Sequence, residues 1–140
     1  MKRHYLESTF DNEFILFGLS AAERPHRLAW LMNTQLHYGF ERKDDMVLIS
    51  KEKQESFFCR FDYLDEINRL QYYLLGNKDE NLQLLPEIRN IDYVLMIKGA
   101  LEYFRKKPFI SAIRHLESIQ LITEIDHYTL KSQHNLVIPD

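Results

Sequence analysis

The chain has little of the material from which many catalytic and metal sites are built. Its one cysteine, Cys59, cannot form a disulfide within the chain, and a site made of several thiolates is excluded. The four glycines are scattered singly, whereas phosphate-binding loops need them clustered. The six histidines include no pair spaced i, i+4 and no HExxH motif, and no Gly-x-Ser-x-Gly motif presents a nucleophilic serine. We therefore predict a protein that is not an enzyme and that uses no metal or cofactor.

An excess of basic residues and long apolar runs are also missing. The formal net charge is −3, whereas a nucleic-acid-binding face needs a basic excess. No stretch approaches the roughly 20 apolar residues of a membrane span, and residues 1–7 lack the apolar run of a signal peptide. We expect a cytoplasmic protein that binds neither nucleic acid nor membrane. The one basic cluster, residues 105–107, is either a solvated loop, which we prefer, or an anion site.

What the chain does contain is enough for one folded domain. At 140 residues with 45% hydrophobic residues, it should bury about two-thirds of its unfolded surface as a single domain spanning residues 1–140. The eight tyrosines and nine phenylalanines exceed what one core of this size readily hides. Some of these rings should therefore lie at the surface, where they could anchor a partner.

Periodicity predicts the order β-α-β-β-β-β-α-β. Apolar or alternating runs of strand type occupy residues 13–19, 46–49, 56–63, 70–75, 91–98 and 121–125. Helical spacing covers residues 24–38, with Gly39 placed to end the helix, and Pro108 opens a second helix. The fold class is α+β: a mainly antiparallel sheet of about five to six strands that carries two helices on one face. The polar tail, residues 129–140, is expected to run over the surface.

Residues 85–93 are the most distinctive segment. They read Leu85-Pro86-Glu87-Ile88-Arg89-Asn90-Ile91-Asp92-Tyr93 and resemble the signature of the IPExxxVDY family of small bacterial proteins, with Leu85 in place of isoleucine and Ile91 in place of valine. The Arg27-Leu28-Ala29-Trp30 run with Asn33, and the closing segment 130–136, also resemble that family. Pro25 and His26 depart from the aspartate and aromatic residue expected there. The family has no established biochemical function; its genes often lie beside the pyruvate kinase gene, which suggests that enzyme as a partner.

The signature also has a physical interpretation as the entry to a strand. Pro86 favours an extended chain before it, and alternation places Ile91, Tyr93, Leu95 and Ile97 on one face. Asp92, Val94 and Met96 then fall on the other face. A carboxylate between apolar neighbours needs a partner. Asp92 is therefore either a structural carboxylate, which we prefer, or a ligand-binding or catalytic one.

Six residues form the candidate partner or ligand surface: Arg27, Trp30, Asn33, Glu87, Asp92 and Tyr93. We expect Arg27 to pair with Asp92 or Glu87, the alternative being that each is separately solvated. Trp30 lies off the apolar stripe of its helix, and either packs under a loop, which we prefer, or faces a partner.

Two functions fit these observations. The first is a non-catalytic protein-interaction or regulatory module, which could form a homodimer through the same surface. The alternative is a small-molecule-binding domain, with or without weak enzymatic activity, whose site lies near Arg27, Asn33 and Asp92. A closed pocket favours the second function, and an exposed aromatic patch favours the first.

Overall fold

The computed structural model describes residues 13–80 and 82–139, in which six strands form one antiparallel sheet. The expectation that the chain has no signal peptide concerns residues 1–7, which lie outside this range. The sheet order is β2-β3-β4-β5-β1-β6. The α+β class and the predicted order of strands and helices are confirmed. The strands are β1 (Ile15–Ala21), β2 (Glu41–Ile49), β3 (Glu55–Asp65), β4 (Leu70–Gly76), β5 (Tyr93–Gly99) and β6 (Ile119–Ile125); the helices are α2 (Pro25–Leu36) and α3 (Lys106–Arg114).

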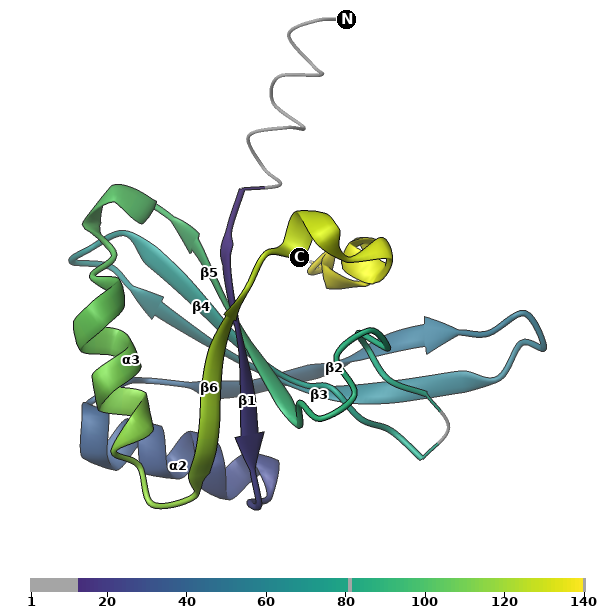
Figure 1. Ribbon diagram of the computed structural model, residues 1–140, viewed down its shortest axis with the longest axis horizontal. Helices are drawn as coiled ribbons and strands as arrows, with labels where there is room; N and C mark the ends of the chain where they lie inside the picture. The colour runs from purple at the N-terminus through teal and green to yellow at the C-terminus, as the bar shows by residue number, and fades with distance from the viewer. Residues whose placement is uncertain (1–12, 81, 140) are drawn as a thin grey trace, which may run out of the picture.

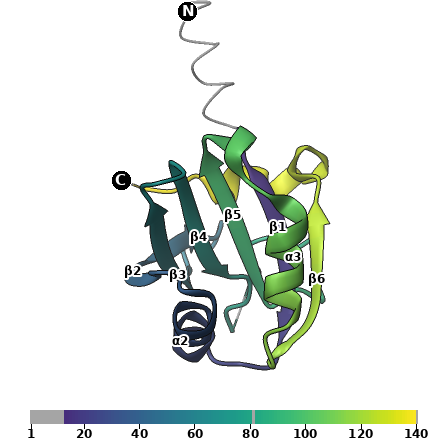
Figure 2. The ribbon, with the colours of Figure 1, turned by 90° about the vertical axis from the view of Figure 1, so that its left-hand side faces the viewer.

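Both helices pack against the same face of the sheet, as predicted (Figure 2). The buried residues on this side form what we name the helix-side core. The sheet supplies residues whose side chains point towards the helices, and each helix supplies an apolar stripe. Its members include Phe17, Leu19, Phe61, Tyr72, Leu74 and Leu95 from the strands, Leu28 and Met32 from α2, and Phe109 and Ile113 from α3.

The opposite face is covered by irregular chain and by the C-terminal 3-10 helices rather than by α-helices (Figure 1). Three short 3-10 helices follow or connect the main elements: η1 (Leu101–Tyr103), η2 (His127–Thr129) and η3 (Lys131–Leu136). The prediction that the tail runs over the surface was wrong, because Leu130 and Leu136 are buried in this layer. We name the layer the second core: Leu16, Met46, Phe58, Leu75, Leu84, Leu85, Ile91, Val94, Met96, Leu130 and Leu136.

Strand β5, which begins at the last residue of the signature, shows why both faces of the sheet must be covered. In β5, Tyr93 and Leu95 belong to the helix-side core, whereas Val94 and Met96 belong to the second core, so the predicted alternation is confirmed. A strand that is apolar on both sides is stable only when both sides are buried. The predicted side was wrong for Ile91, which precedes the strand, escapes its alternation and packs in the second core.

Several element ends differ from the prediction: β1 is shifted by two residues, for example, and α3 begins at Lys106 rather than at Pro108. Helix α2 ends at Leu36, and His37 rather than Gly39 takes the left-handed conformation, with φ of 60°. Strand β2 begins at Glu41, five residues earlier than predicted, and contains Asp44 and Asp45. The register of β2 against β3 shifts between Lys43 and Met46. Because β2 is at the edge of the sheet, its charged side chains remain in water.

Candidate functional site

The signature segment is organised by Asn77, which immediately follows β4 and is fully buried. The Asn77 side chain accepts a hydrogen bond from the Leu85 amide at 2.8 Å and donates to the carbonyls of Ile91 at 2.9 Å and Ile88 at 3.3 Å. The Asn77 amide also donates to the Asp92 carbonyl at 2.9 Å. One side chain therefore satisfies the backbone of the loop that carries the signature. This role was not apparent from the sequence, because an asparagine after a glycine is typical of an exposed turn.

The two carboxylates of the signature bind separate segments of the chain. Asp92 accepts a hydrogen bond from the Ala21 amide at 2.9 Å and pairs with the Lys78 ammonium at 3.0 Å. Glu87 accepts from both the backbone amide, at 3.0 Å, and the hydroxyl of Ser132 in η3. The hydrogen bonds from Ser132 lower the pKa of Glu87 below its usual value. Both carboxylates therefore act as structural ties, one to the end of β1 and one to the tail.

Tyr93 and Asn33 are likewise engaged in structural hydrogen bonds. The Tyr93 hydroxyl donates to the carbonyl of Glu23, in the segment that leads into α2, and burial raises the pKa of this phenol. Asn33 donates to the Phe40 carbonyl at 3.0 Å and accepts from the Phe40 amide at 2.8 Å. Asn33 thereby fixes the chain at Phe40, between the end of α2 and the start of β2.

Arg27 and Trp30 are the two predicted site residues that remain exposed together. The expected pairing of Arg27 with Asp92 or Glu87 was wrong: Arg27 lies 3.5 Å from Glu23, one turn earlier, and 5.4 Å from the Trp30 ring centroid. Trp30 is 53% exposed, so the preferred prediction of packing under a loop was also wrong. Asn33 and Asp92 are each bonded to backbone elsewhere. Arg27, Asn33 and Asp92 therefore do not converge on a common site.

The exposure of Trp30 gives a direct prediction. Trp30→Ala should change the free energy of unfolding by no more than about 1 kcal/mol, because it removes a surface ring and one cation–π contact. Met32→Ala, in the same helix but fully buried, should cost about 2–5 kcal/mol. Urea titrations followed by circular dichroism measure both. Equal losses in the two variants would mean that Trp30 packs as a core residue.

The surface that stands out lies on the β2–β3 hairpin, which extends away from the helices (Figure 1). Pairing of β3 with β4 begins only at Arg60, and residues 55–58 pair with β2 alone. We name this two-stranded part, residues 46–49 and 55–58, the ribbon. Phe57 shares a face with Cys59 and Phe61, which are packed in the helix-side core, but no helix reaches it. The helix side of the ribbon is therefore bare.

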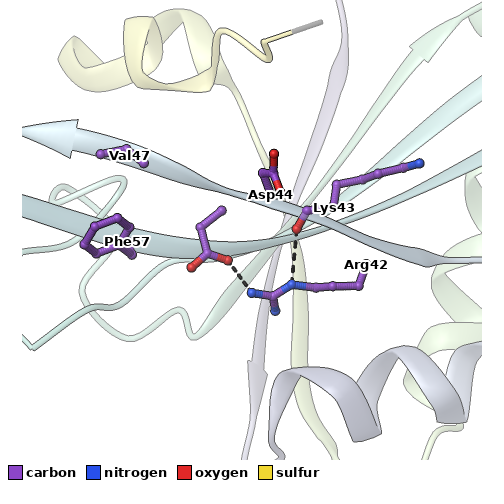
Figure 3. A pocket seen from close by; sticks show the side chains of 6 residues that line it. Arg42, Lys43, Asp44, Val47 and Phe57 are labelled. Atoms are coloured by element: carbon purple, nitrogen blue, oxygen red, sulfur yellow. Dashed lines mark hydrogen bonds and ion pairs between the residues drawn. The ribbon is translucent and has the colours of Figure 1, made fainter.

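The bare face of the ribbon carries three exposed apolar side chains. Val47 and Phe57 are directly opposite each other and are 45% and 50% exposed; Ile49, two residues further along β2, is 67% exposed. Next to them is an open hollow of about 690 Å³ lined by Val47, Phe57 and the charged residues 42–45 (Figure 3). Arg42 donates to the Asp45 carboxylate and to the Lys43 carbonyl, the latter at 3.2 Å. The surface thus combines an apolar centre with neighbouring charges of both signs.

The other side of the ribbon is buried, which holds this surface in place. Met46 and Phe58 point into the second core. The Phe57 amide donates to the Asp79 carboxylate, which joins the ribbon to the segment after β4. An isolated two-stranded hairpin is only marginally stable in water, so these contacts keep the bare face in a fixed position.

Other site chemistry is sparse in the described part of the chain. No group of three or more His, Cys, Asp or Glu side chains between residues 13 and 139, position 81 apart, is placed to hold a metal ion. Cys59 lies in the middle of β3, and burial raises the pKa of its thiol, which disfavours the reactive thiolate. Among the described helices, none has the length and apolar character needed to cross a membrane.

Comparison with known proteins adds no functional assignment. No protein-family model, no curated protein and no solved structure matches this chain. A function for this protein therefore has to be inferred from the geometry of its own residues.

Proposed function

We propose that this protein is a non-catalytic, cytoplasmic protein-interaction module, and that its partner binds the bare face of the ribbon. The observation that supports this most directly is the cross-strand pair of Val47 and Phe57, both about half exposed on a ribbon that is fixed from behind. Aromatic and aliphatic side chains that water can reach, surrounded by charged residues, are typical of the centre and rim of a protein interface.

The edge of β2 gives the partner's mode of binding. Residues 41–45 of this edge are all charged and the register shift lies among them, so an added strand would be left with only the four residues 46–49 to pair along. Charges and bulges on an edge strand oppose pairing with another strand. The partner therefore packs its own apolar side chains onto the face of the ribbon, with acidic and basic groups opposite Arg42 and Asp45.

The small-molecule alternative near Arg27, Asn33 and Asp92 has less support. The side chains of Asn33 and Asp92 form hydrogen bonds with the backbone of Phe40 and Ala21, and Arg27 pairs with Glu23 at the surface. The resemblance to the IPExxxVDY family remains our interpretation of the signature. It makes pyruvate kinase the first partner to test.

The test compares two surface variants of the same strand. Phe57→Ser removes the aromatic anchor, and it should weaken partner binding by at least about thirtyfold, equivalent to roughly 2 kcal/mol. Leu64→Ser is the control, because Leu64 is also in β3 and is 55% exposed but lies away from the ribbon. Binding is measured with purified pyruvate kinase and with proteins retained by the tagged chain from lysate.

The outcomes separate three cases. A partner that is lost with Phe57→Ser and kept with Leu64→Ser supports the proposal. A partner lost instead with Trp30→Ala moves the interface to α2 and contradicts the ribbon as the binding face. Light scattering of the isolated protein measures its oligomeric state. A dimer would mean that the partner is a second copy of this chain rather than a different protein.

A further inference from the structure

A second concave surface, unrelated to the ribbon, lies where the ends of β3 and β4 meet the first turn of α3. It is a cleft of about 350 Å³, within the range of small-molecule sites. Tyr38, Tyr72, Phe104 and Phe109 line it with aromatic rings, and Asp65 and Arg105 are the charged groups at its wall. Along β3, Phe57 of the ribbon and Asp65 of the cleft are about 26 Å apart. The cleft and the ribbon are therefore independent surfaces.

The walls of the cleft are fixed by ring packing. The Tyr38 ring centroid lies 5.7 Å from that of Tyr72 and 5.3 Å from that of Tyr63, with the rings nearly parallel. Tyr72 in turn stacks on Phe109 of α3 at 6.0 Å. Such contacts join α3, the sheet and the segment after α2, so the cleft is formed before any ligand arrives.

Tyr72 carries a polar group that these contacts leave unused. Only 6% of Tyr72 is exposed, and the residue lines the cleft. Its hydroxyl forms no hydrogen bond with residues 13–80 and 82–139, and because Ser56 Oγ is the one fully buried side-chain oxygen without a partner in that part of the chain, the Tyr72 hydroxyl is reached by solvent. Burial, helped by the negative charge of Asp65, raises the pKa of Tyr72 to about 12. The same two causes, among others, raise the pKa of Tyr38. Both phenols are therefore neutral at physiological pH and can accept a hydrogen bond. A hydroxyl that is free to accept, on a residue that lines an aromatic cleft, fits a ligand with a hydrogen-bond donor.

Asp65 supplies a fixed negative charge at the same place. Its two carboxylate oxygens accept hydrogen bonds from the Asn68 amide at 3.2 Å and the Asn68 side chain at 2.9 Å, which set its orientation. No lysine, arginine or histidine of the described residues forms an ion pair with it. Asp65 thus faces the phenols without a counter-ion.

We propose that this cleft binds a small molecule that carries a protonated amine on an aromatic body. The amine would donate to the Asp65 carboxylate and to the Tyr72 hydroxyl, the two acceptors that lack a donor of this kind. The aromatic body would continue the ring packing of Tyr72 and Phe109, and the ring faces favour a nearby cation. Arg105 precedes α3, whereas Asp65 ends β3. An amine is therefore attracted to the wall of the cleft that carries Asp65, and it displaces no existing ion pair there.

The test uses three probes that share one body: phenethylamine, the neutral phenethyl alcohol and the anionic 3-phenylpropionate. Each is titrated into the full-length protein and followed by amide chemical shifts. We expect phenethylamine to move the resonances of residues around Tyr72 and Phe109, and to bind at least tenfold more tightly than the alcohol. Tighter binding by 3-phenylpropionate would overturn the proposal, because it would assign the cleft to anions through Arg105. Shifts confined to other parts of the protein would overturn it as well.

Three variants identify the groups that recognise the amine. Asp65→Asn should weaken phenethylamine at least tenfold and leave phenethyl alcohol unchanged, whereas the neighbouring Glu66→Gln, outside the cleft lining, should change neither. Tyr72→Phe keeps the ring and should weaken the amine about threefold. Tyr72→Phe and the wild-type probe series remain decisive if Asp65→Asn fails to fold. An unchanged amine affinity in both Asp65→Asn and Tyr72→Phe would contradict the assignment.

Discussion

Replacing Asn77 by alanine is expected to lower the free energy of unfolding by about 3–5 kcal/mol, a large share of the stability of a domain of this size. The substitution leaves the Leu85 amide and the carbonyls of Ile88 and Ile91 without the side chain that they bond. Water cannot easily replace it, because Asn77, Leu85 and Ile91 are buried. Each buried group left without a partner costs about 1–3 kcal/mol.

Asn90→Ala is the matched control for this substitution. Asn90 is exposed and contributes its backbone carbonyl, which accepts from the Ser20 hydroxyl at 2.6 Å and is retained by alanine. Its cost should stay within about 0.5 kcal/mol. Urea unfolding measures both variants, and hydrogen exchange of the Leu85 amide reports the local loss. Similar stabilities for Asn77→Ala and Asn90→Ala would show that the loop does not depend on Asn77.

Asn77 also illustrates where the sequence was informative and where it was not. The segment 85–93 stood out as a motif, and the alternation in β5 assigned Tyr93, Leu95, Val94 and Met96 to the correct faces. Such patterns are local, because neighbouring residues in a strand point to opposite sides. The residue that holds the motif lies eight positions before it. Nothing in the local sequence distinguishes a buried asparagine from one in a solvated turn.

The candidate site was predictable to a smaller extent for the same reason. Arg27 and Trp30 are at the surface. The other four candidate residues use their polar groups in hydrogen bonds within the fold: Asn33, Glu87, Asp92 and Tyr93. Two of these bonds join residues about 70 positions apart: Ala21 with Asp92, and Glu23 with Tyr93. A single sequence does not show which distant backbone groups need a partner, so structural polar residues were interpreted as functional ones.

The ribbon and the cleft were missed because both depend on where elements end in space. Alternation along β3 puts Phe57 on the same face as Cys59 and Phe61, which pack in the helix-side core. Whether that face is covered at Phe57 depends on how far the helices reach across the sheet, and β2 was predicted too short for a ribbon to be recognised. The cleft requires Tyr38, Tyr72 and Phe109 from three separate segments to meet, which periodicity within one segment cannot indicate.

The tail gives the second large expected effect, since Leu136→Ala should cost about 2–4 kcal/mol. Leu136 is 3% exposed and packs in the second core, whereas its neighbour Val137 is 71% exposed. Val137→Ala is therefore the control and should change the free energy of unfolding by less than about 0.5 kcal/mol. If the tail ran over the surface, as its polar composition suggested, the two substitutions would have similar, small effects.

The size of the Leu136 effect depends on the part of the sheet that the tail covers. Val94 and Met96 of the central strand β5 are fully buried in the same core, and η3 is held over it by Glu87 through Ser132 and by a hydrogen bond from Asn135 to the Leu84 carbonyl at 2.9 Å. Truncating Leu136 leaves a cavity that these polar contacts prevent from closing, so the lost contacts are not recovered. Urea unfolding gives the stability, and hydrogen exchange at Ser132 reports whether η3 detaches. Full protection at Ser132 together with an unchanged midpoint in Leu136→Ala would mean that the tail does not contribute to the core.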